Sequence, residues 1–198
     1  MRPSRPVVLV SLATAFSLLG DQTLYSVLPT YYTSLNLLPY QVGLILSVNR
    51  WIRLVTNQLA ERFCRKYSLT LLLTLALILG AVTTATYGTA PAFSVLLIAR
   101  IAWGLSWSFI RQAGLMTVVE TTAEGAIGRM VGYYNGISRL GSVGGNMLGA
   151  VGHDLFGFTA TLLVFGAVSL LGVPLGVASR SHAPGKAVPE AITRPTIG

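Results

Sequence analysis

The sequence predicts an all-α membrane protein with six transmembrane helices. Of its 198 residues, 53% are hydrophobic and only 10% are charged, whereas a soluble domain carries roughly 25% charged residues. The mean hydropathy is +0.66. The apolar residues form long runs separated by short polar stretches, and most runs approach the ~20 residues that a helix needs to cross a bilayer.

Composition also limits the classes of function. The net charge of +8 is compatible with nucleic-acid binding, but the basic residues stand singly or at the ends of apolar runs, so we exclude that class. Cys64 is the only cysteine, which excludes a disulfide framework and a cysteine metal cluster. The sequence has no phosphate-binding glycine loop and no nucleophile–base arrangement. We therefore expect no cofactor, no metal site and no enzymatic activity.

The first expected helix covers residues 7–27. Two arginines precede it, as in a signal peptide, but its apolar run is longer than that of a usual signal and no small-residue cleavage site follows. We therefore expect this helix to be retained in the membrane. Pro29 and the polar residues after it end the helix.

The five other expected helices cover residues 40–61, 69–88, 92–115, 130–152 and 158–178. A short turn at 89–91, a polar loop at 120–129 and a turn at 154–157 separate helices that follow one another. We expect 1–178 to form one transmembrane domain. Residues 179–198 contain three prolines and scattered charge, so we expect a cytoplasmic linker or a disordered tail.

The basic residues outside the spans predict the orientation. They occupy the amino terminus, every second loop and the tail, at Arg2, Arg5, Arg62, Arg65, Lys66, Arg129, Arg180, Lys186 and Arg194. The three other loops contain no lysine or arginine. Because cytoplasmic loops carry an excess of basic residues, we expect a multi-pass protein of the plasma membrane with both termini in the cytoplasm.

Charged residues inside the apolar spans are the main functional signal. A charge in hydrocarbon is costly, so such residues face the protein interior or a water-filled cavity. At a rise of ~1.5 Å per residue, Asp21 lies ~9 Å and Arg100 ~12 Å from the outer ends of their helices. These depths are compatible, and we expect charged groups to pair across an interior cavity.

Further arginines lie inside the second, fourth and fifth spans, and Tyr25 shares a helix face with Asp21. We interpret a set of these residues as a pathway for a solute or a proton: Asp21, Tyr25, Arg50, Arg100 and Arg139. The excess of arginines indicates an anionic or carboxylate-bearing solute. The alternative is a structural Asp–Arg pair, with the other arginines, Arg53 and Arg111 in particular, snorkelling to the interface or bonding backbone carbonyls.

The fifth span is rich in glycine, with Gly141, Gly145 and Gly149 at four-residue intervals. Small residues at this spacing let helix backbones approach closely in lipid. We expect a tight helix–helix seam; the alternative is a bend that serves as a gate.

Four motifs together resemble the amino-terminal half of a major facilitator superfamily transporter. They are the acid-bearing segment 20–29, the basic loop segment 49–69, Arg100 followed after four residues by Gly104, and the glycine-rich segment 141–150. The last segment differs from the family's exporters, because Asn146 stands where proline is usual.

The resemblance implies two six-helix halves, each built of two inverted three-helix repeats around a central cavity. It implies secondary active, proton-coupled transport of a small solute by alternating access, with Asp21 binding the proton or substrate and Arg100 as its partner. The lipid bilayer and a second six-helix half would be its partners. The chain would be a fragment of a twelve-helix protein or a half-size protein that pairs with a second copy. The alternative is a non-transporting half-size subunit that assembles with a partner.

The loop between the second and third helices resembles the family's loop motif in two registers, which place either Glu61 or Arg65 at the motif's acidic position. The resemblance implies that this loop is a conformational latch, with Asn57, Glu61, Arg62, Arg65 and Lys66 as its motif residues; the second register would lose the motif's acid.

Overall fold

The computed structural model describes residues 3–89 and 92–181. Its helices are α1 (Arg5–Tyr31), α2 (Pro39–Lys66), α3 (Leu69–Thr89), α4 (Phe93–Glu120), α5 (Ile127–Ser169) and α6 (Gly172–Ser181), with the short 3-10 helices η1 (Tyr32–Leu35) and η2 (Glu124–Ala126). The described residues contain no strand. The prediction of an all-α membrane protein is therefore confirmed. The part of the expected tail at 182–198 lies outside the described residues.

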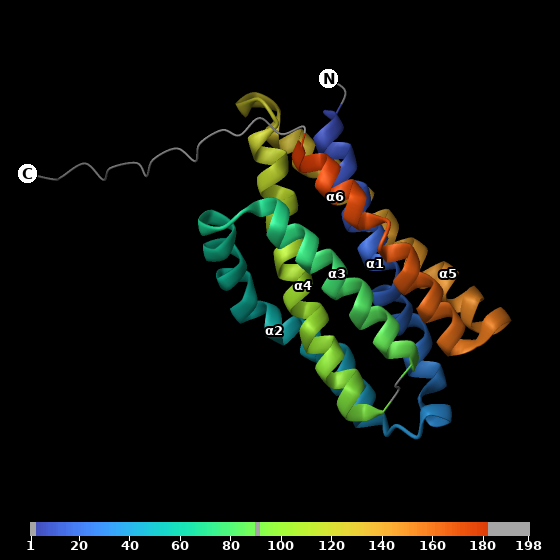
Figure 1. Cartoon of the computed structure of the whole chain (residues 1–198). Coiled ribbons are helices and arrows are strands. Elements are labelled where there is room, and N and C mark those ends of the chain that lie inside the picture. The colour runs from blue at the N-terminus through green and yellow to red at the C-terminus, as the bar shows by residue number, and fades with distance from the viewer. Residues whose placement is uncertain (1–2, 90–91, 182–198) are drawn as a thin grey trace, which may run out of the picture.

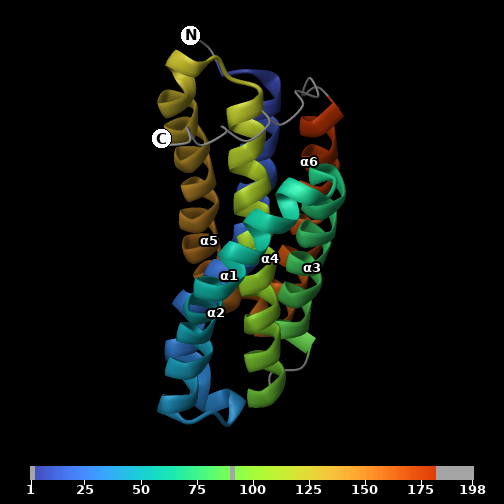
Figure 2. The same cartoon turned by 90° about the vertical axis from the view of Figure 1, so that its left-hand side faces the viewer.

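The helices form an elongated bundle in which most of them run along its length (Figures 1 and 2). α1 is the most enclosed of them, and more than half of its 27 residues are buried. α5 and α6 lie against α1, while α2 packs on α4. Because α1 carries Asp21, this arrangement places the acid inside the bundle.

α5 consists of two arms that meet at Gly157, whose backbone has φ 81° and ψ 172°. The first arm runs beside α1 in the same direction, so that Gly141 contacts Ala15. The second arm returns beside α3, where Thr159 donates a hydrogen bond to the carbonyl of Gly88 at 2.9 Å. The chain reverses direction at Gly157 because glycine accepts this conformation without steric cost.

Four segments are long and apolar enough to cross a membrane: Arg5–Leu35, Leu69–Thr89, Phe93–Glu120 and Glu124–Ser181. The last contains both arms of α5 together with α6. α2 is not among the four, because polar residues such as Asn49, Arg50 and Arg53 lower its mean hydropathy. These helices define a multi-pass integral membrane protein.

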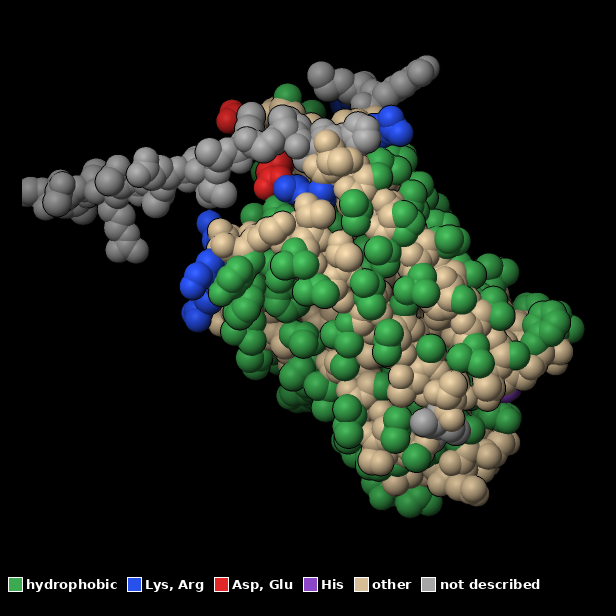
Figure 3. Space-filling view, in the orientation of Figure 1, with side chains coloured by type: hydrophobic (Ala, Val, Ile, Leu, Met, Phe, Trp, Pro, Cys, Tyr) green, Lys and Arg blue, Asp and Glu red, His purple; other side chains and the backbone are tan. Residues whose placement is uncertain are grey.

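On one face, charged side chains gather toward the end of the bundle that carries the amino terminus (Figure 3). On the face seen in Figure 3, the blue Lys and Arg side chains and the red acids lie toward the end that carries the amino terminus, and the remaining surface shows hydrophobic side chains among other side chains and backbone. At this end Arg180 contacts Glu120 at 2.6 Å and also donates to Thr117 at 3.2 Å. This cluster fastens α6 to the end of α4.

Candidate functional site

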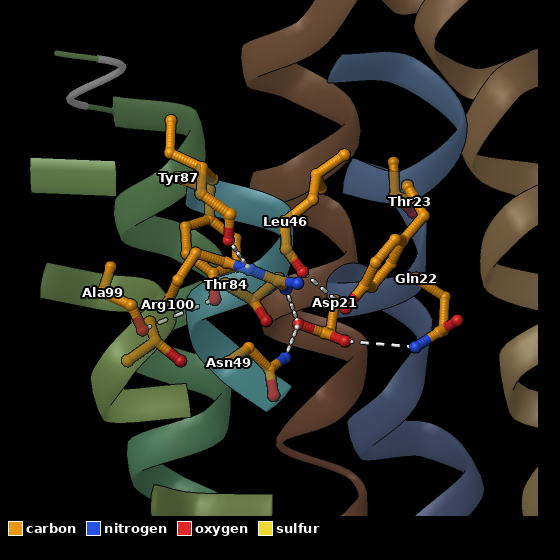
Figure 4. Close-up of polar contacts among 12 residues, drawn as sticks. Asp21, Gln22, Thr23, Leu46, Asn49, Thr84, Tyr87, Ala99 and Arg100 are labelled. Carbon is orange, nitrogen blue, oxygen red and sulfur yellow. Dashed lines mark hydrogen bonds and ion pairs between the residues drawn. The ribbon is translucent and has the colours of Figure 1, made fainter. Parts of the chain in front are cut away.

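An ion pair between α1 and α4 lies at the centre of the site. The side chains of Asp21 and Arg100 are 1% and 0% exposed, and Arg100 Nη1 contacts Asp21 Oδ1 (Figure 4). Arg100 Nε donates to the carbonyl of Ile45 at 3.2 Å, and Gln22 Nε2 donates to Asp21 Oδ2 at 3.1 Å. These contacts fix the guanidinium and the carboxylate, which buried charges require.

α2 contributes Asn49 to this pair. Asn49 Nδ2 donates to Asp21 Oδ1 at 3.5 Å, and the carbonyl of the same residue accepts from Arg53 Nε at 3.0 Å. α2 can approach α4 this closely because Gly104 has no side chain. A Cβ at Gly104 would lie 3.1 Å from the Asn49 carbonyl oxygen and would overlap Ile52.

The ring of Tyr25 lies beside the buried pair and also lines a neighbouring cavity. The Arg100 Cζ atom is 4.8 Å from the ring centroid and the Arg50 Cζ atom is 5.9 Å from it. Both distances are within the range of a cation–π interaction. The Tyr25 hydroxyl donates to the carbonyl of Leu46 at 3.4 Å. One aromatic ring therefore contacts a buried and an exposed guanidinium.

The cavity has a volume of about 330 Å³. Four helices line it, through Leu18, Asp21, Gln22, Tyr25, Arg50, Arg53, Trp103, Trp107, Arg111, Tyr134, Asn135, Ser138, Arg139 and Ser142. Four of these residues are arginines, and the single carboxylate among them is already paired with Arg100. The cavity is therefore strongly positive.

Two pairs of helices face each other across this cavity. α1 and α5 supply Asp21, Tyr25 and the polar residues from Tyr134 to Ser142 on one side. α2 and α4 supply Arg50, Arg53, Arg111 and two tryptophans on the other.

The structure brings four of the predicted pathway residues together at the cavity, namely Asp21, Tyr25, Arg50 and Arg139. Arg100 lies behind Asp21 and does not line it. Arg53 and Arg111, for which a structural role was the main alternative, also line the cavity. The loop-motif residues Asn57, Glu61, Arg62, Arg65 and Lys66 lie elsewhere, exposed on the last turns of α2. Glu61 and Arg65 form an exposed ion pair there at 2.9 Å.

The helix-packing glycines lie at two contacts between helices. Gly141, Gly145 and Gly149 of α5 lie directly against α1, where an added Cβ would overlap the Ala15 and Leu19 carbonyl oxygens or the Thr23 side chain. Gly104 lies against α2, as described above.

Several residues at the site were absent from the predicted set, and two of them are Asn49 and Trp103. Asn49 contacts the Asp21 carboxylate, and Trp103 lines the cavity. Trp103 lies four residues before Trp107 and eight before Arg111, so helical spacing was the signal that could have identified it. Within 3–89 and 92–181, no group of three or more His, Cys, Asp or Glu side chains could hold a metal ion.

A buried ion pair beside a charged cavity, within a bundle of membrane-length helices, defines a multi-pass membrane protein with an internal polar site. The model of the Major Facilitator Superfamily matches residues 10–196. The chain belongs to this superfamily, whose members are membrane transporters rather than enzymes. The resemblance inferred from the four motifs is thus confirmed. No curated protein matches the chain.

Proposed function

We propose that this chain forms one half of a secondary active transporter, which moves a small anionic solute together with protons by alternating access. One observation carries the proposal: four arginines line a cavity whose single carboxylate is already neutralised by Arg100.

Arginine suits the binding of an anion. It stays protonated at any physiological pH, and its planar group of donors matches a carboxylate or a phosphate. The cavity of about 330 Å³ is at the lower end of the range for small-molecule sites. A bound anion would relieve the mutual repulsion of Arg50, Arg53, Arg111 and Arg139, because Asp21 is the only acid among the described lining residues and is paired with Arg100.

Asp21 is the group that would carry the proton. Protonation of its carboxylate would remove the charge that holds Arg100 and would weaken the contact between α1 and α4. Gln22 and Asn49, which both donate to this carboxylate, would then lose an ionic acceptor. Binding of one proton would thereby weaken the contacts of α1 with both α2 and α4 at the Asp21 carboxylate.

Tyr25 would connect the proton site to the solute site. Arg50 and Arg100 lie near the same ring, and Arg50 is exposed to the cavity. An anion that draws Arg50 toward itself would remove one of the two cations from the ring. The remaining interaction with Arg100 would change, so solute binding would be felt at the ion pair.

A second six-helix half would complete the transporter, as a carboxy-terminal half or as a second copy. Arg50, Arg111 and Arg139 are exposed at the cavity, and a charge facing hydrocarbon is costly. A partner that covers this side would shield the arginines from lipid and leave them in a water-filled cavity. The exposed residues at the end of α2, from Asn57 to Lys66, would act as the latch.

We also propose six membrane crossings, in two inverted three-helix repeats. α1 to α4 would each cross once, the first arm of α5 would form the fifth crossing, and its second arm with α6 the sixth. The gathering of basic side chains at the end with the amino terminus (Figure 3) supports a cytoplasmic location for both termini in the plasma membrane. Residues 1–178 would form the membrane domain, with 179–198 as its linker or tail.

The test is uptake of radiolabelled carboxylates into liposomes that contain the whole chain, with and without an imposed proton gradient. We expect gradient-driven accumulation, and we expect Asp21→Asn to abolish accumulation while solute exchange at equal pH persists. Glu124→Gln, which removes an exposed acid outside the cavity, is the matched control.

Two results would contradict the proposal. Accumulation that still responds to the proton gradient in the Asp21→Asn variant would remove Asp21 from proton coupling. A folded chain that transports no anion, alone or with a second half, would instead favour a non-transporting subunit.

A further inference from the structure

The tryptophans of the cavity indicate a property of the solute that the arginines do not, namely whether it contains a flat ring. Trp103, Trp107 and Arg111 follow one another at four-residue intervals on α4 and all line the cavity. Residues at this spacing share one face of a helix. On the cavity face of α4, two indole rings are therefore followed along the helix by a guanidinium.

The two indole rings are stacked. Their centroids are 5.7 Å apart and their planes differ by 10°. Trp103 is 1% exposed, and its Nε1 atom is 3.8 Å from the position of a Cβ on Gly80 of α3. Its Nε1 atom thus lies near α3 and has no hydrogen-bond partner among the described residues.

Trp107 is only half-buried, and its ring lies offset from and nearly parallel to that of Trp103. It lies near the middle of α4, so the anchoring of helix ends in the membrane interface, where tryptophan is common, does not explain its position. Leu18 of α1, which is 4% exposed, adds a further apolar side chain to the cavity. A polar cavity thus contains one flat apolar surface.

Arg111 lies four residues beyond Trp107, which is ~6 Å along the axis at a rise of ~1.5 Å per residue. Arg139 reaches the same cavity from α5. A ring placed on Trp107 would share the cavity with both arginines, and these are the groups that could bind a carboxylate on its edge. Aromatic rings gain from such parallel stacking beyond the burial of their area.

We propose that the solute is a planar aromatic carboxylate, whose ring lies on Trp107 and whose carboxylate binds Arg111 and Arg139. This inference rests on the proposed function, because it specifies the class of anion that the same cavity takes.

The test compares three probes that differ in one property each: 2-naphthoate, its fully saturated counterpart decahydro-2-naphthoate, and the neutral 2-naphthamide. Their affinities are measured by calorimetry on the whole chain in lipid nanodiscs. We expect 2-naphthoate to bind about two- to tenfold more tightly than the saturated acid, the range given by the energy of an aromatic pair. The neutral amide is expected to bind more weakly than 2-naphthoate.

Variants locate the contacts. Trp107→Leu should remove the preference for the aromatic acid, Trp107→Phe should keep it, and Arg111→Gln should weaken both acids equally. The control Trp51→Leu changes a tryptophan that is 69% exposed and outside the cavity lining, and it should change neither affinity.

The comparison of the two acids needs no variant, so the inference can fail on the unmodified chain. Equal binding of both acids, still dependent on Arg111, would overturn the aromatic preference and leave anion transport standing. Equal binding of 2-naphthoate and 2-naphthamide would overturn the role of the arginines as well. If neither acid bound, the inference and the anionic site would both fail.

Discussion

Asp21 and Arg100 form an ion pair between buried side chains, which are 1% and 0% exposed. The two residues are separated by 79 positions in the sequence, so the pair forms only when α1 and α4 come together. It therefore reports on the packing of the bundle as well as on the chemistry of the site.

Removal of one member of this pair should destabilise the bundle more than removal of both. Arg100→Gln leaves a buried carboxylate without its cation, which costs about 3–5 kcal/mol. The double variant Asp21→Asn with Arg100→Gln should lose less than the sum of the two single changes. Thermal unfolding in detergent measures all three, with Glu124→Gln as control. Strictly additive losses would show that the two charges do not interact.

Tyr25 should matter through its ring. Tyr25→Phe keeps the ring and loses a single hydrogen bond, to the carbonyl of Leu46. Tyr25→Leu loses the contacts with both guanidinium groups, each worth about 0.5–2 kcal/mol. We expect uptake driven by a proton gradient to fall about tenfold in Tyr25→Leu and to change little in Tyr25→Phe. Tyr40→Leu, at a tyrosine that is 63% exposed, is the control, and a similar loss in Tyr25→Phe would assign the effect to the hydroxyl.

Two glycines of α5 should respond to alanine with opposite signs. At Gly145 an added Cβ would overlap the Leu19 carbonyl oxygen, so α1 and α5 must separate, at a cost of about 1–3 kcal/mol. At Gly136 the added Cβ meets nothing within 4 Å, so alanine should stabilise the helix by about 0.5–1 kcal/mol. Melting temperatures of the two variants in detergent would show this difference. A stabilised Gly145→Ala variant would mean that the seam is loose.

Gly157→Ala should be destabilising for a reason that involves no clash. An added Cβ at Gly157 meets nothing within 4 Å, but the backbone has φ 81°. Other residues pay about 1–3 kcal/mol in this region. Gly132→Ala, in open space within helical backbone, is the matched control, and equal melting temperatures for the two variants would show that the reversal tolerates a side chain.

The contact of Arg180 with Glu120 should hold α6 in place. These side chains are 14% and 21% exposed, so we expect Arg180→Gln to cost about 1 kcal/mol, the upper end for a partly exposed pair. Hydrogen exchange of the α6 amides should become faster. The exchanged pair Glu120→Arg with Arg180→Glu should restore protection, and a failure to restore it would point to the Thr117 hydrogen bond instead.

The sequence predicted the helical class and the charged interior because both depend on local composition. It also predicted compatible depths for Asp21 and Arg100, since helical rise converts residue number into depth. Helical rise says nothing about how each helix is rotated toward its neighbours. Arg53 and Arg111 could therefore face a cavity or snorkel outward, and only the packed bundle places them in the cavity.

For the same reason, the sequence did not show which helices pack against each other. The spacing of Gly141 and Gly145 predicted a close seam, but nothing in that spacing identified α1 as the neighbour. Asn49 was overlooked because its role depends on Gly104, which lies on another helix and lets α2 approach. Contacts between helices that are distant in sequence require the tertiary structure.

The two glycine contacts have a mechanical consequence. Gly145 lies against the Leu19 carbonyl, and Gly104 lies against Ile52 and the Asn49 carbonyl, so these helices meet with little room between their backbones. We expect α1 and α5 to move together as one rigid body, and α2 and α4 to move together as another. Relative motion of the two pairs would then change mainly the side-chain contacts between them beside the cavity, such as that of Asp21 with Arg100. A proton or an anion could break these side-chain contacts without any helix having to bend.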